Sequence, residues 1–414
     1  MSNIACGLDF GTSNTTLGVN GDLLPLEAGA VTLPSAVCWE VDGAPPRFGR
    51  AAIAAYLEGE EGRLLRGLKS TLGSGLIQER TRIGNRAVSF REVLGRFMAH
   101  AKTQAEAAYG QPFQSVVLGR PVHFIDDDPE GDRQAQNVLA EIAREIGFAD
   151  IGFQYEPIAA ALDYETRLTD EELVLIVDVG GGTSDFSIVR VGPLRAQKPD
   201  RAADILANDG IRLGGTDFDR AFSLAEVMPE LGYLAPTKGG QGTMPRHYYH
   251  DLATWHRINM LYTDRVLSDM KALSYEIDTP EKLARMIHVL QNAQGHGLAL
   301  EVERAKIALS ETESIRLLLK PLTNGPNPMV TQPRLETALA PLMERLRLRI
   351  DTVLDQAGLT ADQISTVFLT GGSSALPLLG RVVASRFATA KLARGDDLAS
   401  VGTGLSLDAA RRYR

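Results

Sequence analysis

Hydrophobic residues recur at every second position in the first segment that the sequence predicts to be a strand. In IACGLDF, the side chains of Ile4, Cys6, Leu8 and Phe10 fall on one face of an extended chain. Three later apolar runs predict further strands: SVVLGRPV, LVLIVDV and STVFLTGG.

Helical segments separate these strands. MERLRLRIDTVLDQAG ends at Gly358 in the way that helices commonly end. After the glycine turn that follows STVFLTGG, the side chains of Leu376, Leu379, Val382 and Val383 lie on one side of a further helix. The alternation of strands and helices predicts an α/β architecture.

Two stretches with the same order of residues organise the chain. GLDFGTSNTTLGV and VDVGGGTSDFSIV each carry an aspartate, an apolar residue, a glycine and then a threonine, and Asp9 and Asp178 are 178 − 9 = 169 residues apart. That spacing is too long for a solenoid and suits a duplicated domain. One such turn is usually no more than a hairpin, but two copies at the heads of similar lobes favour a ligand between them.

Glycine turns of this kind can cradle phosphate, because their N–H groups are exposed and oxygen atoms can approach the main chain closely. Asp9 and Asp178 would repel a triphosphate unless a cation lay between them, so the paired turns predict Mg²⁺. Magnesium releases its waters reluctantly, and we expect water between the metal and both aspartates. The predicted N–H and O–H donors are Gly11, Thr12, Ser13, Gly180, Gly181, Gly182 and Thr183.

Composition narrows the class of protein. The 414 residues carry 43 Lys and Arg against 52 Asp and Glu, a net charge of −9, so no overall positive field attracts nucleic acid or an anionic membrane. Cys6 and Cys38 are too few for a disulfide framework, which fits a reducing compartment. The start MSNIACGLDF lacks the pattern of a signal peptide, and no apolar run has membrane-spanning length. We expect a cytoplasmic protein whose partners are neither nucleic acid nor membrane.

Three histidines, His247, His250 and His256, lie in MPRHYYHDLATWH. Without neighbouring cysteines they do not form the usual set of converging zinc ligands, and we expect no metal site there. The aromatic residues nearby are expected to pack a helical subdomain or to meet a partner: Tyr248, Tyr249, Trp255 and Tyr262.

The same residues resemble a known family. GLDFGTSNTTLGV, VDVGGGTSDFSIV and FLTGGSSALPLL are similar to the first phosphate, second phosphate and adenosine motifs of the actin-like ATPase superfamily, and within it most closely to the heat-shock 70 kDa chaperone family. Family-like segments also lie in order along the chain: LPSAVCWE, LKSTLG, YEPIAAALDYE, LGGTDFD and VERAKIALS. Residues 228–300 match poorly. The short outline resembles the chaperone-like proteins called YegD.

The resemblance implies a site for ATP or ADP with Mg²⁺, in which Asp9 and Asp178 hold the metal through water. Lys69 corresponds to a lysine that approaches the γ-phosphate and the attacking water, although a lysine after apolar positions is ordinarily on a solvated face. Glu156, beside Pro157, corresponds to a glutamate that couples the lobes and orients metal-bound waters. The resemblance assigns two further side chains, Asp185 near the nucleophilic water and Thr183 in contact with phosphate.

The adenosine side matches the family in part. The corresponding residues are Gly371, Gly372 and Ser373 for the sugar and α-phosphate, Glu303, Lys306 and Ser310 for the ribose and base, and Gly214, Gly215, Asp217 and Asp397 for the rest of the pocket. Ala375 and Ile307 stand where the family usually has arginines that pack over the base. Two cation–π contacts, each worth about 0.5–2 kcal/mol, would be absent. This departure predicts weaker binding and a less strict choice of base.

From the resemblance we predict the actin-like ATPase fold, with two similar ribonuclease-H-like lobes around a nucleotide cleft. Lobe I would comprise residues 1–168 and 396–414, and lobe II residues 169–395, with the divergent helical segment near 228–300. Full-length chaperones of the family continue into a peptide-binding domain, whereas this chain stops at LSLDAARRYR. We expect that domain to be absent.

The predicted function is an ATP-binding, ATP-hydrolysing switch that acts on an unidentified protein partner, with ATP and ADP favouring different arrangements of the lobes. Three alternatives stay open. A small-molecule kinase would need a second pocket, and a filament-forming protein would need self-complementary lobe ends. A nucleotide sensor would bind ATP with negligible turnover.

Overall fold

The computed structural model describes residues 4–40, 44–58, 62–72, 75–83, 86–125, 128–165, 168–198, 200–240, 242–394 and 400–413. The chain forms two compact units. The first unit comprises Met1–Arg212, Leu348–Ser374 and Val383–Arg414, and the second comprises Leu213–Arg347 and Ala375–Val382. The predicted lobe boundary near residue 168 falls inside the first unit, and the division into two lobes stays a prediction.

One sheet of the first unit contains the strand predicted around Asp9. Its order is β11 (Asp150–Tyr155), β10 (Ser115–Arg120), β1 (Ala5–Phe10), β2 (Asn14–Val19) and β3 (Asp22–Leu23), and β4 (Leu33–Pro34) also pairs with β2. β1 is parallel to β10 and antiparallel to β2, so β1 and β2 form the predicted hairpin. Because side chains alternate along a strand, Leu8 and Phe10 enter the core while Asp9 lies on the opposite face.

A second sheet of the same unit repeats this arrangement. Its order is β14 (Ile205–Ile211), β13 (Ser184–Val191), β12 (Glu172–Val179), β17 (Thr366–Thr370) and β18 (Lys391–Arg394). β12 is antiparallel to β13 and parallel to β17, as β1 is to β2 and β10. The strands predicted from LVLIVDV and STVFLTGG are confirmed, and the two sheets share one pattern of pairing.

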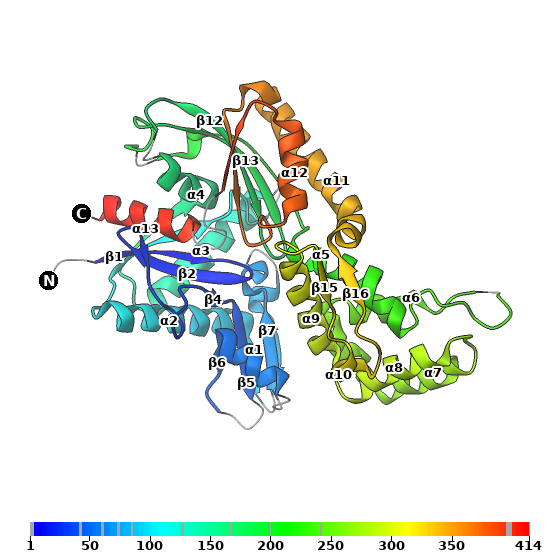
Figure 1. Cartoon of the computed structure of the whole chain (residues 1–414). Helices are drawn as coiled ribbons and strands as arrows, with labels where there is room; N and C mark the ends of the chain where they lie inside the picture. The colour runs from blue at the N-terminus through cyan, green and yellow to red at the C-terminus, as the bar shows by residue number, and fades with distance from the viewer. Residues whose placement is uncertain are drawn as a thin grey trace. The chain divides into compact units, whose positions relative to one another are not determined.

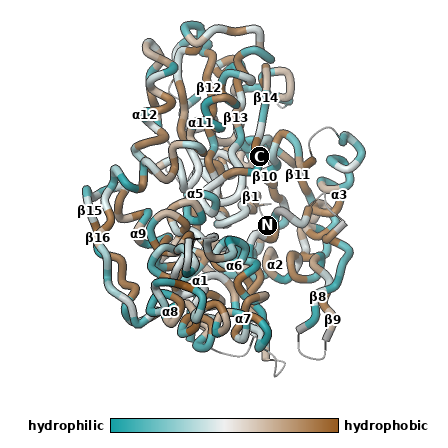
Figure 2. The backbone as a smooth tube through the Cα atoms, turned by 90° about the vertical axis from the view of Figure 1, so that its right-hand side faces the viewer, coloured by the Kyte–Doolittle hydropathy of each residue, from teal (hydrophilic) through white to brown (hydrophobic). Residues whose placement is uncertain are grey.

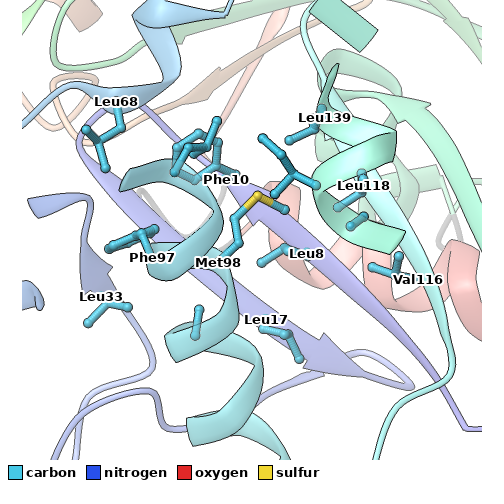
Figure 3. Packing of buried hydrophobic residues seen from close by; sticks show 14 of the residues in the cluster. Leu8, Phe10, Leu17, Leu33, Leu68, Phe97, Met98, Val116, Leu118 and Leu139 are labelled. Carbon is cyan, nitrogen blue, oxygen red and sulfur yellow. The ribbon is translucent and has the colours of Figure 1, made fainter. Parts of the chain in front are cut away.

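Helices bury both faces of the first sheet. α2 (Phe90–Tyr109) and α3 (Pro129–Glu145) cover one face, and Figure 3 shows Phe97 and Met98 of α2 packed near Leu8 and Phe10 of β1. α4 (Glu156–Glu165) and α13 (Ser400–Arg412) share a second buried cluster with residues of both sheets. α13 runs beside β1, although the two lie near opposite ends of the sequence (Figure 1).

The first unit also contains smaller elements. α1 (Gly49–Leu57) packs on a three-stranded sheet of β6 (Arg47–Phe48), β5 (Ala36–Glu40) and β7 (Gly62–Arg66), and β8 (Arg80–Ile83) pairs with β9 (Arg86–Ser89). Short 3-10 helices are η1 (Leu68–Thr71), η2 (Gly75–Gln78), η3 (Ala202–Asp204) and η7 (Ala361–Gln363). α11 (Gln332–Ala357) and α12 (Pro377–Arg386) each have residues in both units. The predicted helix before Gly358 is confirmed as α11.

The second unit is mainly helical. Its helices are α5 (Gly215–Phe222), the π-helix η4 (Ser223–Val227), η5 (Met228–Leu231), α6 (Arg246–Leu252), η6 (Trp255–Leu261), α7 (Asp264–Ser274), α8 (Pro280–Gln291), α9 (Gly295–Ala308) and α10 (Lys320–Thr323), and β15 (Ser314–Arg316) pairs with β16 (Met329–Thr331). Tyr249 is fully buried, and the ring of Trp255 packs edge-on against His296. Tyr249 and Trp255 therefore pack within this helical unit, and contact of the aromatic residues with a partner stays a prediction.

Hydrophobic and hydrophilic residues are mixed along the helices of this unit. Figure 2 shows both kinds along α7 and α8, as expected of helices that bury one face. In α8 the buried side chains include Leu283, Met286 and Val289. Among the residues that the structure describes, no helix is both long and apolar enough to cross a bilayer.

Glycines let α13 approach its neighbours closely. A Cβ atom at Gly404 would lie 1.8 Å from the carbonyl oxygen of Ala159 in α4. One at Gly7 in β1 would lie 2.2 Å from the backbone nitrogen of Ser406. The serine hydroxyl also accepts a hydrogen bond from the backbone N–H of Gly21. Backbone-to-backbone packing therefore holds α13 against both α4 and the first hairpin.

We expect Gly404→Ala to lower the free energy of unfolding by about 1–3 kcal/mol, because the added methyl group overpacks rigid backbone. Urea denaturation of the purified chain measures the change. Gly95→Ala in α2 is the matched control, since its Cβ would meet one atom of Ile142 at an ordinary 3.8 Å. The control should be neutral or stabilising, as alanine is the better helix former. An unchanged midpoint for Gly404→Ala would show that the contact is not tight.

Candidate functional site

The two hairpins place an aspartate at the same point of each sheet. Asp9 is paired with Thr16 across the β1–β2 hairpin, and Asp178 is paired with Asp185 across the β12–β13 hairpin. Each aspartate is followed by a glycine loop, which comprises residues 11–13 in the first hairpin and 180–183 in the second. The predicted strand, turn, strand arrangement is confirmed in both copies.

The two glycine loops lie against each other within the first unit. A Cβ atom at Gly181 would lie 1.8 Å from the hydroxyl oxygen of Ser13, and one at Gly182 would lie 3.8 Å from the methyl carbon of Thr12. Gly180 donates its N–H to the carbonyl of Thr183 over 3.0 Å, which closes the second loop as a tight turn. The structure thus brings together the two loops that the sequence places 169 residues apart.

Lys69 reaches the same region from the short helix η1. Its ammonium nitrogen is 2.5 Å from a carboxylate oxygen of Glu156, the first residue of α4. The preceding residue, Leu68, is buried in the core of the first sheet and anchors this turn (Figure 3). Gly119 at the end of β10 faces both acids: its Cβ would lie 3.6 Å from Asp9 Oδ1 and 3.4 Å from Glu156 Cγ.

Glu156, Asp9 and Asp178 act on this ammonium group, and Asp185 acts on Asp178. We call these four acids the carboxylate cluster. Burial, together with the charges of Asp185, Glu156 and Asp9, raises the pKa of Asp178 to about 8. Burial and Glu156 raise the pKa of Asp9 to about 7, against the opposing effect of Lys69. Burial disfavours the charge on Lys69, but Glu156, Asp9 and Asp178 together outweigh it and raise the pKa of the lysine. The cluster has more negative charge than Lys69 can balance.

An excess of half-buried carboxylate fits a divalent cation, which would neutralise it. Within the described ranges, no three His, Cys, Asp or Glu side chains converge closely enough to hold a metal ion directly. Magnesium commonly keeps several of its waters and uses one or two carboxylates with phosphate oxygens. Asp9 and Asp178 therefore suit a hydrated magnesium ion.

A serine that the sequence did not single out shapes the first glycine loop. The hydroxyl of Ser35 donates to the carbonyl of Gly11 over 2.7 Å, and its N–H donates to the carbonyl of Ser13 over 2.8 Å. The Thr15 hydroxyl lies 3.1 Å from the same Ser35 oxygen. Ser35 belongs to the segment LPSAVCWE, but neither its type nor its spacing indicates these contacts.

The turn after β17 is tied to the second glycine loop. Gly371 has a φ of +84°, and a Cβ there would lie 2.3 Å from a carboxylate oxygen of Asp178, so glycine alone fits. Ser373 donates its N–H to the carbonyl of Val179 over 3.0 Å and its hydroxyl to the carbonyl of Gly180 over 3.2 Å. Gly371, Gly372 and Ser373 thus adjoin Asp178 and its loop.

The remaining adenosine residues lie in the second unit. Lys306 on α9 is buried, and its ammonium nitrogen is 2.8 Å from Asp219 Oδ1 and 3.4 Å from the carbonyl of Gly215. The hydroxyl of Ser310 donates to the carbonyl of Lys306. Asp219 is the last residue of LGGTDFD, and the sequence did not predict its contact with Lys306.

The other positions predicted on the adenosine side have different surroundings. The N–H of Gly214 donates to Asp217 Oδ2 over 3.0 Å, which caps the start of α5. Glu303 lies on α9, and Ile307 on the same helix is 58% exposed. Asp397, assigned to the rim of the pocket, lies outside the described residues.

Comparison with known proteins identifies the class. A family model described as Hsp70 protein matches residues 69–227 and 263–405. The fold is that of the actin-like ATPases, as predicted, and the chain belongs to the Hsp70 family. The match leaves out residues 228–262 but includes 263–300, so the poorly matching segment is shorter than predicted.

One relative is the chaperone protein HscA of Pectobacterium carotovorum subsp. carotovorum (strain PC1). It is 27% identical over 319 residues, which cover 77% of this chain and 40% of the relative. The chain therefore matches less than half the length of that protein. The resemblance to the YegD proteins stays a prediction.

The cluster predicts a pH-dependent stability for the nucleotide-free protein. The pKa of Asp178 is about 8 when folded against an ordinary value of 3.8, so the folded chain retains a proton that the unfolded chain releases. The stability linked to this proton is fully present below pH 3.8 and is lost as the pH rises to about 8. Between about pH 5 and 8, the parent should lose about 3–4 kcal/mol more than Asp178→Asn, whose side chain cannot ionise.

Urea denaturation at several pH values, without magnesium or nucleotide, measures this difference. Asp355→Asn, at an exposed position of α11, is the control and should follow the parent. Parallel curves for the parent and Asp178→Asn would contradict the raised pKa.

Proposed function

We propose that this chain is a magnesium-dependent ATPase of the Hsp70 type, whose nucleotide state controls its action on a protein partner. The observation that carries the proposal is the carboxylate cluster around Lys69 beside two opposed glycine loops. Such a site suits a polyphosphate bound with a divalent cation, because the cation offsets the charge of both.

The residues divide the work between binding and hydrolysis. Gly11–Ser13 and Gly180–Thr183 donate N–H and O–H groups to phosphate oxygens, and the turn at Gly371–Ser373 admits the sugar and α-phosphate. Asp9 and Asp178 would hold magnesium, which would supply neutralisation of the phosphate charge. Phosphoryl transfer depends mainly on such positioning and on charge neutralisation.

Lys69 and Glu156 act on the attacking water. The Lys69 ammonium, kept charged by the cluster, stabilises negative charge on the γ-phosphate oxygens. Glu156 accepts a hydrogen bond from a water molecule and orients it, while Asp185 contributes a second acceptor nearby. Glu303, Lys306 and Ser310 bind the ribose and base, and Lys306 exchanges part of its contact with Asp219 for nucleotide. Gly214 and Gly215 complete the pocket, with Asp397 at its rim.

The cycle of ATP binding and hydrolysis changes the conformation of the chain, and a protein partner recognises that change. ATP and ADP differ in their contacts with the glycine loops, so each favours a different arrangement of the chain. The partner contacts the segment from about residue 228 to 300, whose first part lies outside the family match. The action takes place in the cytoplasm and involves neither nucleic acid nor membrane.

A nucleotide sensor is the second candidate, and one observation favours it. Ile307 is exposed on α9 at a position where the family usually has an arginine over the base. Weak base contacts would suit a protein that reports nucleotide levels with little turnover. Single-turnover hydrolysis with magnesium, beside calorimetry with ATP, ADP and GTP, separates a sensor from an ATPase.

Lys69→Ala should abolish hydrolysis while leaving measurable ATP binding, because the lysine acts mainly on charge that develops during transfer. Loss of one preorganised donor costs about 10²–10³ in rate. Single-turnover hydrolysis and calorimetry measure the two quantities separately. Lys102→Ala is the control, since Lys102 forms a similar partly buried pair with Glu106 on α2. Turnover by Lys69→Ala at the parent rate would reject the assignment.

Ile307→Arg should tighten binding of adenine nucleotide by about 2- to 30-fold, the equivalent of one cation–π contact of about 0.5–2 kcal/mol. Calorimetry with ATP and with GTP measures the gain and any change in base preference. Met260→Arg is the control, because Met260 is also exposed in the second unit, at 63%. Equal affinities for the parent and Ile307→Arg would show that the nucleotide base does not bind beside residue 307 of α9.

A further inference from the structure

Arg120, the last residue of β10, has an unusually complete set of contacts. Its Nε donates to the carbonyl of Pro121 over 3.0 Å, and its Nη2 donates to the carbonyl of Val122 over 3.1 Å. Nη2 also lies 2.7 Å from Asp132 Oδ2, and Nη1 donates to Gln136. The Arg120 side chain is 11% exposed. The guanidinium therefore joins the end of β10 to the first turns of α3.

The same guanidinium lies between two aromatic rings. Its central carbon is 5.3 Å from the ring centroid of Phe124 and 5.2 Å from that of Tyr155. Tyr155 ends β11 and is paired in register with Arg120. Glu156, the partner of Lys69, is the next residue along the chain. Arg120 thus restrains the residue that immediately precedes the glutamate.

The loop after β10 is restrained by the same group of residues. Asp132 accepts the Phe124 N–H at its other carboxylate oxygen over 2.6 Å, while Arg120 holds the carbonyls of Pro121 and Val122. The residue before Arg120 is Gly119, which faces Asp9 and Glu156. Both strand ends that border the carboxylate cluster on this side are therefore attached to one guanidinium.

We propose that Arg120 is a positioning residue for hydrolysis, which holds Tyr155 and the start of α4 so that Glu156 keeps its place beside Lys69. This inference rests on the proposed function for its effect on turnover. The planar fork of arginine can bond a carboxylate, an amide and two carbonyls while it stacks on aromatic rings, and a lysine cannot make that set. A shift of about 1 Å at a catalytic group can cost about 100-fold in rate.

The test compares Arg120→Met with the parent in single-turnover hydrolysis and nucleotide calorimetry. We expect a loss of about 10- to 100-fold in the hydrolysis rate, with nucleotide affinity little changed. Arg91→Met is the matched control, because Arg91 on α2 pairs with Glu141 and Glu145 near the far end of α3. The Arg91→Met substitution weakens the attachment of α3 but does not affect the contacts of Tyr155. This variant should hydrolyse ATP at the parent rate.

A double variant separates positioning from general loosening of the fold. In a Glu156→Gln background, Arg120→Met should lower the hydrolysis rate little further, because Arg120 acts on hydrolysis through the position of Glu156. Additive losses, or an Arg120→Met protein that hydrolyses ATP at the parent rate, would overturn the inference. Arg120→Lys serves if the methionine variant does not fold, and it should show an intermediate loss; a parent-like rate for that variant also overturns the inference.

A nucleotide-free measurement keeps this inference separate from the proposed function. The coupling between Lys69 and Glu156 in the free energy of unfolding is measured with Lys69→Met, Glu156→Gln and the double variant. The coupling should be present in the parent background and largely lost in the Arg120→Met background. If the parent itself fails to hydrolyse ATP, the proposed function fails, and the double-mutant cycle in unfolding still decides the role of Arg120. Equal Lys69–Glu156 coupling in the parent and Arg120→Met backgrounds would contradict the positioning role of Arg120.

Discussion

The ion pair between Lys69 and Glu156 is the interaction on which the rest of the site depends. Asp9 and Asp178 act on the same lysine and Asp185 acts on Asp178, and gathering these half-buried carboxylates is costly unless opposite charge is available. The lysine supplies one positive charge and its pKa rises in response. The remaining negative charge is the feature on which the proposed binding of magnesium with a polyphosphate rests.

Rigid neighbours on every side maintain this unfavourable arrangement. Leu68 anchors the lysine in the core, Ser35 shapes the first glycine loop, and Gly371 leaves room for the Asp178 carboxylate. None of these residues carries charge, yet each limits how far the acids can move apart. Without a cation, the raised pKa values of Asp9 and Asp178 mean that bound protons offset part of this negative charge.

Much of the fold could be predicted from local patterns, because alternating apolar residues and paired glycine turns report on strands and hairpins directly. Asp9 and Asp178 followed from the repeat itself. Lys69 and Glu156 needed the family resemblance, since a lysine after apolar positions is ordinarily solvated and an acid at a helix start can simply favour the dipole. Ser35, Asp219 and Arg120 escaped prediction because their contacts join segments whose proximity is set by tertiary packing.

The position of α13 bears on how the chain is made. This helix covers β1 and β2 through backbone contacts at Gly7 and Gly404, but nearly the whole sequence is translated between the hairpin and the helix. During synthesis on the ribosome, one face of the first hairpin stays uncovered until α13 has been translated. Burial of this face of the sheet is thus a late, long-range step of folding.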